Sequence, residues 1–242
     1  MAVAASRTDP GRDLVEGARE AAGAAEALLA DATLAVRRRV TRDGKVNARL
    51  IDREQRATHG LAWLATYSQA VRQLAAYAER MGAAERLGAI EDLVVRIGLG
   101  EYLAQMIGGI PMSQGEMVRP ADLGLSMDQV AARITPAVEA LIAAGNDARN
   151  RARLIELMRE HQGVSVGDPG LDDTLDAVRE EMRKFAQSEV EPHAHQWHLT
   201  NNYIPLEIIA QMAELGMDHD ASVLRQRLQL LIRIAQLLAL VG

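Results

Sequence analysis

The sequence predicts an all-α protein, and three features of its composition and patterning indicate this. Alanine, leucine, glutamate and arginine are abundant, and these residues have high helix propensity. Only seven of the 242 residues are aromatic, namely two Trp, four Tyr and one Phe, and runs of β-branched residues are short, which disfavours strands. No window alternates polar and apolar residues with the period of two of a half-buried strand. We therefore expect helices and no sheet of three or more strands.

Turn and capping residues divide the first part of the chain into helices. A first helix is expected over residues 12–40, after Pro10 and before the turn Asp43-Gly44. A second begins near Asn47 and has one apolar face for packing on another helix. That face recurs at steps of three and four residues and comprises Ala57, Gly60, Leu64, Tyr67, Val71, Leu74, Ala78 and Met81.

Three more helices follow before residue 162. One spans about 89–107 and ends at Gly108-Gly109, and a long loop leads from there to Ser126. Ser126 and Gln129 have the spacing of a capping box, which predicts a helix start. Pro136 should kink or split this helix, and Asn146 is expected to cap a last one that ends near His161.

Residues 163–170 form the predicted domain boundary, because three glycines and a proline lie within eight residues. We expect a helical N-terminal domain over residues 1–162, a linker over 163–170 and a second segment over 171–242. The second segment begins with an amphipathic helix that Pro192 must disturb. Its apolar face comprises Leu171, Leu175, Val178, Met182 and Phe185.

The end of the chain predicts two further helices. A short one begins at Pro205 and ends at Leu215-Gly216, and an amphipathic helix follows over Ser222–Val241. Three arginines in the latter exclude a comfortable membrane span. We expect it to pack on the helices around Leu175–Phe185 and Ile204–Leu215, within the chain or across a dimer. The alternative is a helix that lies on a membrane surface or binds a partner.

Net charge and cysteine content exclude some classes of function and of binding site. The formal net charge is -6, so the basic excess expected of a nucleic-acid-binding protein is missing. The absence of cysteine excludes disulfides and thiolate metal sites. The N-terminal residues lack the apolar stretch of a secretory signal. We expect a cytoplasmic protein with no nucleic-acid partner.

The densest cluster of chemically active side chains is His193, His195 and His198, with Glu189 and Glu191 just before them. Imidazole and carboxylate groups bind zinc or iron. On a helix, however, His193 and His195 point about 200° apart and only His195 and His198 share a face. We therefore expect capped or hydrogen-bonded histidines and no metal site.

Other motifs are weaker. The segment Gly98–Leu103 begins like a dinucleotide-binding loop but lacks the third glycine and the preceding strand. Gly108–Gly115 could offer backbone amides to a phosphate, yet it follows a helix, which favours a connector. His59, Trp63 and Tyr67 stand at steps of four residues on one helix face. Such an aromatic stripe is more typical of a core than of a ligand site.

Several strings resemble flavin-dependent acyl-CoA dehydrogenases over about residues 48–216. The opening helices of these enzymes are similar to Leu171–Arg179, Phe185-Ala186, Val190–His198, Ile204–Ile209 and Ala213–Gly216. Earlier strings resemble the N-terminal extension of the methylsuccinyl-CoA dehydrogenases in this family. These are His59–Tyr67, Gly100–Gln105, Gly108–Gly115 and Arg119–Gly124.

This resemblance implies FAD as cofactor and an acyl-CoA substrate. In the family a carboxylate takes the α-proton while the flavin N5 accepts the β-hydride. The family's later segments, a Pro-Glu-Glu-Tyr-Gly-Gly-like string, a β-domain and a C-terminal helical bundle, bind FAD and supply the catalytic glutamate. None of them follows Gly216 in this sequence. The resemblance therefore assigns no catalytic or cofactor-binding residue here.

Two functions remain open at this point. The first is an acyl-CoA dehydrogenase-like polypeptide that is incomplete and inactive alone and has no cofactor of its own. Its partner would be the remainder of a dehydrogenase or a second copy. The alternative is a non-catalytic helical module for interaction or oligomerisation.

Overall fold

The computed structural model describes residues 10–113, 115–161 and 166–214. The chain divides into two compact units, residues 1–170 and 171–242, and each is described by itself. The amphipathic helix predicted over Ser222–Val241, and the predicted helix end at Leu215-Gly216, lie outside the described residues.

The first unit consists of helices and two small hairpins. In chain order these are α1 (Pro10–Val40), β1 (Thr41–Arg42), β2 (Lys45–Val46), α2 (Ala48–Arg53), α3 (Gln55–Ala83), α4 (Ala89–Gly108), β3 (Ile110–Pro111), β4 (Met117–Val118), α5 (Met127–Ala131), α6 (Pro136–Ala144) and α7 (Ala148–His161). Each pair of strands is antiparallel and stands apart from the other pair. The all-α prediction is therefore confirmed, with two-residue strands as its only β-structure among the described residues.

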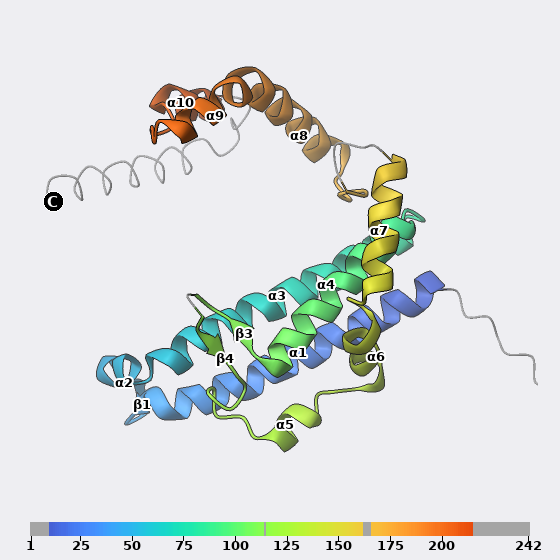
Figure 1. Cartoon of the computed structure of the whole chain (residues 1–242). Helices are drawn as coiled ribbons and strands as arrows, with labels where there is room; N and C mark the ends of the chain where they lie inside the picture. Colours follow the sequence, from blue (N-terminus) through green and yellow to red (C-terminus); the bar gives the residue numbers. More distant parts are fainter. Residues whose placement is uncertain (1–9, 114, 162–165, 215–242) are drawn as a thin grey trace, which may run out of the picture. The chain divides into compact units, whose positions relative to one another are not determined.

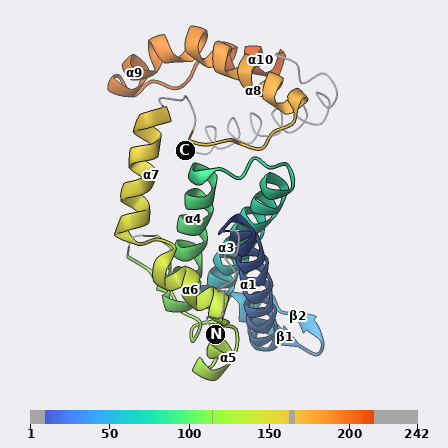
Figure 2. The ribbon, with the colours of Figure 1, turned by 90° about the vertical axis from the view of Figure 1, so that its right-hand side faces the viewer.

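The core of this unit lies where α1, α3 and α4 pack side by side, as Figures 1 and 2 show. The buried face of α1 is rich in alanine, which lets the α3 backbone approach closely. Its buried alanines are Ala18, Ala21, Ala25, Ala32 and Ala35. The predicted apolar face of α3 is confirmed, because its members are buried except Tyr67 and Leu74, which are partly buried and pack against the core.

Two predicted helix starts are confirmed. Ser126 and Gln129 form the capping box at the start of α5, with both reciprocal hydrogen bonds present. Pro136 does split the helix, because α6 begins at this residue and the Thr135 side chain caps it. Proline at a first helical position costs no hydrogen bond, since that N–H has no partner within the helix.

Three local predictions were wrong. The second predicted helix is interrupted at Glu54, so Asn47 caps only the short α2. The last helix of the unit begins at Ala148 and not at Asn146, because the Asp147 carboxylate accepts the Asn150 N–H at 2.7 Å. The predicted long loop before Ser126 contains the hairpin β3–β4.

The second unit contains α8 (Asp173–Phe185), a π-helical turn (Ala186–Val190), α9 (Glu191–Leu199) and α10 (Leu206–Glu214). Pro192 disturbs the long helix as predicted: α-helical bonding stops at Phe185, and Pro192 lies in the first turn of α9. Pro205 precedes α10, and its carbonyl accepts the Ile208 N–H at 3.1 Å. Among the described residues no helix is both long enough and apolar enough to cross a membrane.

Candidate functional site

A network of hydrogen bonds in the first unit holds residues 166–170 against the end of α3 and the start of α4. The Tyr77 hydroxyl donates to the Asp168 carbonyl. The Arg86 guanidinium donates to both oxygens of the Asp168 carboxylate, each at 2.7 Å, and the Asp168 N–H donates to the Glu91 carboxylate at 2.7 Å. We call Tyr77, Arg86, Glu91 and Asp168 the clamp.

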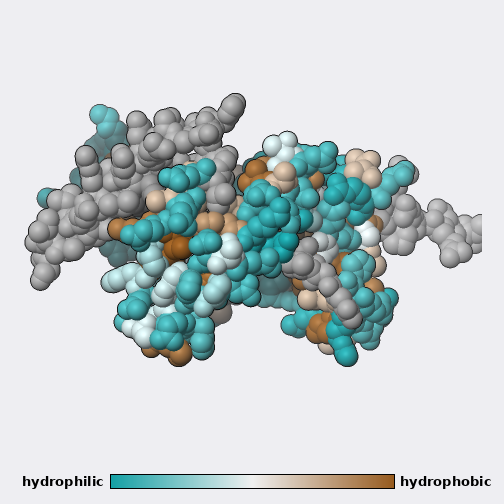
Figure 3. All heavy atoms as spheres, turned by 90° about the horizontal axis from the view of Figure 1, so that it is seen from above, coloured by the Kyte–Doolittle hydropathy of each residue, from teal (hydrophilic) through white to brown (hydrophobic). Residues whose placement is uncertain are grey.

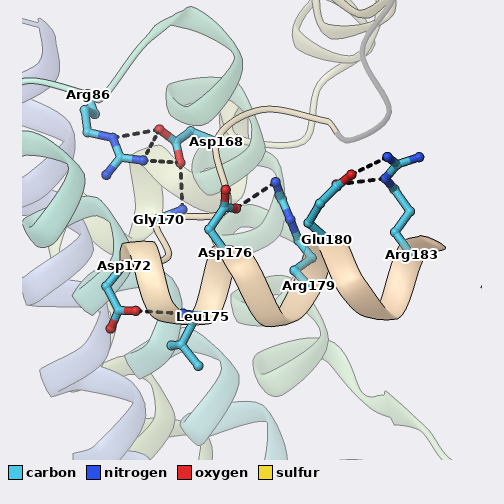
Figure 4. A network of polar contacts seen from close by, with 9 residues as sticks. All are labelled: Arg86, Asp168, Gly170, Asp172, Leu175, Asp176, Arg179, Glu180 and Arg183. Carbon is cyan, nitrogen blue, oxygen red and sulfur yellow. Dashed lines mark hydrogen bonds and ion pairs between the residues drawn. The ribbon is translucent and has the colours of Figure 1, made fainter. Parts of the chain in front are cut away.

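Glycines make the clamp possible, and Figure 4 shows the Arg86–Asp168–Gly170 part of it. The Gly170 N–H donates to the Asp168 carboxylate at 2.8 Å. Gly167 and Gly170 have φ of 74° and 66°, a region that side-chain-bearing residues rarely adopt. A Cβ at Gly167 would also lie 2.8 Å from a Glu91 carboxylate oxygen. The clamp therefore requires these glycines.

The electrostatics of the clamp favour a neutral phenol beside two carboxylates. Glu91 is only 8% exposed, and a buried carboxylate needs hydrogen-bond donors such as the Asp168 N–H. Burial raises the pKa of Tyr77, and the negative charges of Glu91 and Asp168 raise it further. Tyr77 therefore keeps the proton that it donates to the Asp168 carbonyl.

The second unit begins with its own helix cap, which is also drawn in Figure 4. The Asp172 carboxylate accepts the Leu175 N–H at 2.8 Å and so starts α8. Exposed ion pairs follow along α8 and include Arg179–Asp176 and Arg183–Glu180. Sequence reasoning did not identify the clamp or this cap, although the glycines of residues 163–170 were the available signal.

The aromatic stripe on α3 is only partly core. The Trp63 indole N–H donates to His59 Nε2 at 3.0 Å, and the Tyr67 hydroxyl donates to Gln105 Oε1 at 2.8 Å. Tyr67 also packs edge-on against Tyr102, with ring centroids 4.9 Å apart. Trp63 and Tyr67 pack against the core, whereas His59 is exposed, so the core prediction was wrong for His59.

The two glycine segments serve packing and turns. Gly98–Leu103 lies inside α4, and a Cβ at Gly100 would lie 2.7 Å from the Leu141 carbonyl. Gly100 thus allows α4 and α6 to cross closely. In Gly108–Gly115 the Met112 N–H donates to the Glu116 carbonyl at 2.9 Å, so this amide closes the hairpin turn and does not face a ligand.

The three histidines of α9 are exposed. His193 stacks at a tilt on Trp197, with ring centroids 5.7 Å apart. Within the described part of the chain, no group of three or more His, Cys, Asp or Glu side chains is arranged to hold a metal ion. The absence of a bound metal in the protein stays a prediction.

The described residues do not fit the FAD that the resemblance implies. A flavin site needs a mostly apolar slot for the ring and donors for the pyrophosphate. A hollow of about 390 Å³ between α1, α4, α6 and α7 is lined by Asp13 and alanines. Its two arginines are already paired with carboxylates, Arg96 with Asp92 at 2.7 Å and Arg149 with Asp147 at 3.5 Å. A second hollow, of about the same volume, presents Glu189 and Glu214, which would repel a pyrophosphate.

The surface seen in Figure 3 is mostly hydrophilic. Hydrophilic residues predominate there, and hydrophobic residues form separate small groups. The exposed apolar side chains of the second unit include Leu175 and Val178, which are 52% and 46% exposed. These two residues belong to the predicted apolar face of α8.

Comparisons with known proteins support the resemblance predicted from the sequence. Residues 172–219 match the family model described as the N-terminal domain of acyl-CoA dehydrogenases. The chain is 44% identical over 206 residues to the (2S)-methylsuccinyl-CoA dehydrogenase of Cereibacter sphaeroides. That alignment covers 85% of this chain and 37% of the relative, so the chain spans little more than a third of that protein's length.

Proposed function

We propose that this chain works as the N-terminal part of an FAD-dependent acyl-CoA dehydrogenase whose substrate is a thioester such as methylsuccinyl-CoA. The observation that carries this proposal is the extent and order of the match. The alignment of 206 residues is longer than the first unit and therefore reaches into both units. The match to the dehydrogenase domain begins at residue 172, two residues after the first unit ends.

We further propose that the chain does not oxidise the thioester alone. The described residues do not fit FAD, and none of their carboxylates is assigned as a base. When bound, FAD supplies the acceptor for the substrate's hydride. The described residues would contribute a folded helical domain and the first helices of the dehydrogenase domain.

In this function the clamp acts as a positioning site. Tyr77, Arg86 and Glu91 hold Asp168 on the first unit, and α8 begins only a few residues later. The clamp thereby fixes the point from which the dehydrogenase helices leave the first unit. A fixed departure point limits the conformations that assembly with further dehydrogenase segments must order.

The test is complementation of the purified chain. The chain alone should show no flavin absorption bands and no methylsuccinyl-CoA-dependent reduction of an electron acceptor such as ferrocenium. Adding FAD and the Cereibacter sphaeroides enzyme lacking its matching N-terminal part should restore both. A yellow chain that oxidises the thioester unaided would contradict the inactivity, and a complement that stays inactive would contradict the dehydrogenase role.

A matched pair of variants tests the clamp within the same assay. Arg86→Gln removes the two bonds to Asp168 and should reduce the restored activity by weakening assembly. Arg151→Gln removes an equal charge from an exposed side chain of α7 that forms no described ion pair, and should leave complementation unchanged. Equal effects of both variants would argue against a positioning role.

The second candidate is a non-catalytic module for interaction or oligomerisation. The exposed Leu175 and Val178 on α8 favour it, because an uncovered apolar helix face tends to associate. This function predicts a colourless, folded oligomer by light scattering whose state does not respond to the enzyme complement.

A further inference from the structure

One corner of the first unit is strongly basic although the chain as a whole is acidic. Residues 37–53 contain seven basic and two acidic side chains, whereas the whole chain has a net charge of -6. They include the end of α1, the hairpin β1–β2 and α2, which lie at the same end of the helix bundle (Figure 1). We call residues 37–53 the basic corner.

Most cations of the basic corner are not neutralised by the described part of the protein. Arg39 and Arg53 both pair with Glu54, at 3.8 and 3.4 Å. The other basic side chains are exposed and have no ion pair or side-chain hydrogen bond to any described residue. They are Arg37, Arg38, Arg42, Lys45 and Arg49.

Two of these cations occupy directly opposed backbone positions in a hairpin. Arg42 and Lys45 are cross-strand partners in β1–β2, and the turn between them is tight, with φ of 51° at Asp43 and 76° at Gly44. Like charges at directly opposed positions of a ladder are destabilising. No described carboxylate pairs with either side chain, so both remain available to an anion from outside.

The side chains around these cations indicate which class of anionic partner fits the basic corner. Neither of the two hollows described above is lined by residues of the corner, whose cations lie on an exposed surface. Residues 34–53 include no aromatic side chain on which a nucleic-acid base could stack. Exposed aliphatic side chains accompany the cations instead, because Leu34 and Val46 are 57% and 63% exposed.

Leu34 also lies on the same face of α1 as two of the cations. It precedes Arg37 and Arg38 by three and four residues, the spacing that places side chains next to one another on a helix. Cations interspersed with exposed aliphatic groups are typical of surfaces that lie in the headgroup region of a membrane.

We propose that the basic corner binds the surface of an anionic phospholipid membrane. Four of the five unpaired cations are arginines, whose forked guanidinium groups suit phosphate oxygens. Lipid phosphates would neutralise the opposed Arg42 and Lys45, while Leu34 and Val46 would enter the headgroup layer. This proposal does not rest on the proposed function, because it requires neither flavin nor thioester.

The test is co-sedimentation of the full chain with lipid vesicles at low salt. The chain should bind vesicles of phosphatidylcholine and phosphatidylglycerol in equal parts, should not bind phosphatidylcholine alone, and should dissociate as salt is added. Each neutralised cation near the surface should weaken binding about fivefold, so Arg42→Gln with Lys45→Gln should weaken it roughly 25-fold. Both replacements remove mutual repulsion, so this variant should melt no lower than the parent.

The charge-matched control replaces Arg151 and Arg159 of α7 with glutamine. Both side chains are exposed and form no described ion pair, so binding should be retained. Equal weakening by the control would overturn the proposal in favour of a net-charge effect. Equal binding to both vesicle types, or tighter binding to duplex DNA or polyglutamate than to the anionic vesicles, would also overturn it.

Discussion

Asp122 shows how one carboxylate can hold a whole loop. It accepts the Arg119 N–H at 2.8 Å and pairs with Arg56 at 3.3 Å. Its own carbonyl accepts a bond from Arg39 at 2.9 Å. The Arg119 N–H, followed by the contact with Arg56, lowers the pKa of Asp122 below its ordinary value of 3.8.

The lowered pKa predicts a pH-dependent effect of Asp122→Asn. The carboxylate's stabilisation is fully present above pH 3.8 and is lost as the pH falls through the lower folded-state pKa. The variant should therefore be about 2 kcal/mol less stable than the parent at neutral pH, and the difference should shrink in acid. Urea unfolding at several pH values measures this. A stability difference that stays the same from neutral pH into acid would contradict the role of the Asp122 charge.

Tyr77→Phe should loosen the clamp without disturbing the core. It removes one hydrogen bond to the Asp168 carbonyl, worth about 1 kcal/mol, so the Asp168 amide should exchange its hydrogen roughly fivefold faster. Tyr102→Phe is the matched control, because no described residue hydrogen-bonds its hydroxyl. Exchange that is equally fast in both variants would mean that the Tyr77 contact does not hold the segment.

The clamp also marks the limit of prediction from sequence for single residues. The glycines and the proline of residues 163–170 predict a chain that turns, because only they adopt such conformations cheaply. They do not reveal where the chain docks, since Tyr77 and Asp168 lie 91 residues apart. Tyr77 also falls outside the predicted apolar face of its helix.

Helices were predicted well because their signals are local. Capping at Ser126 and the break at Pro136 follow from neighbouring residues. The hairpins were missed because two-residue strands cannot show an alternating pattern. The turn at Asp43-Gly44 was predicted, but β4 depends on distant packing, with Val118 lying over Gly60.

That packing predicts opposite effects of alanine at two helical glycines. A Cβ at Gly60 would lie 2.4 Å from a Val118 methyl group, so Gly60→Ala should push β4 from α3 and cost about 1–3 kcal/mol. Gly23 in α1 has open space around such a Cβ, so Gly23→Ala should stabilise by about 0.5–1 kcal/mol. Urea unfolding of both variants measures the contrast. A neutral Gly60→Ala would contradict the close approach of α3 and β4.

At the level of the whole molecule, the segment 163–170 joins the two compact units, and its described part is residues 166–170. The composition predicts a linker between two domains. In the structure, residues 166–170 belong to the first compact unit and form hydrogen bonds with α4 and with the residues around the end of α3. A linker composition and a docked segment are compatible, because glycines also supply the turns that docking requires.

Two truncated chains test whether residues 163–170 stabilise the first unit or serve only as a linker. Chain 1–170 retains the clamp, whereas chain 1–162 loses every contact of Asp168 and leaves Glu91 without the amide that it accepts. Loss of these bonds should make 1–162 less stable by about 1–3 kcal/mol, with part of the Arg86 contribution screened by solvent because its side chain is 48% exposed. Urea unfolding midpoints measure the difference. Asp168→Asn in chain 1–170 should reproduce part of the loss of stability. If both chains unfold at the same urea concentration, residues 163–170 contribute nothing to the first domain and act only as the linker that their composition predicts.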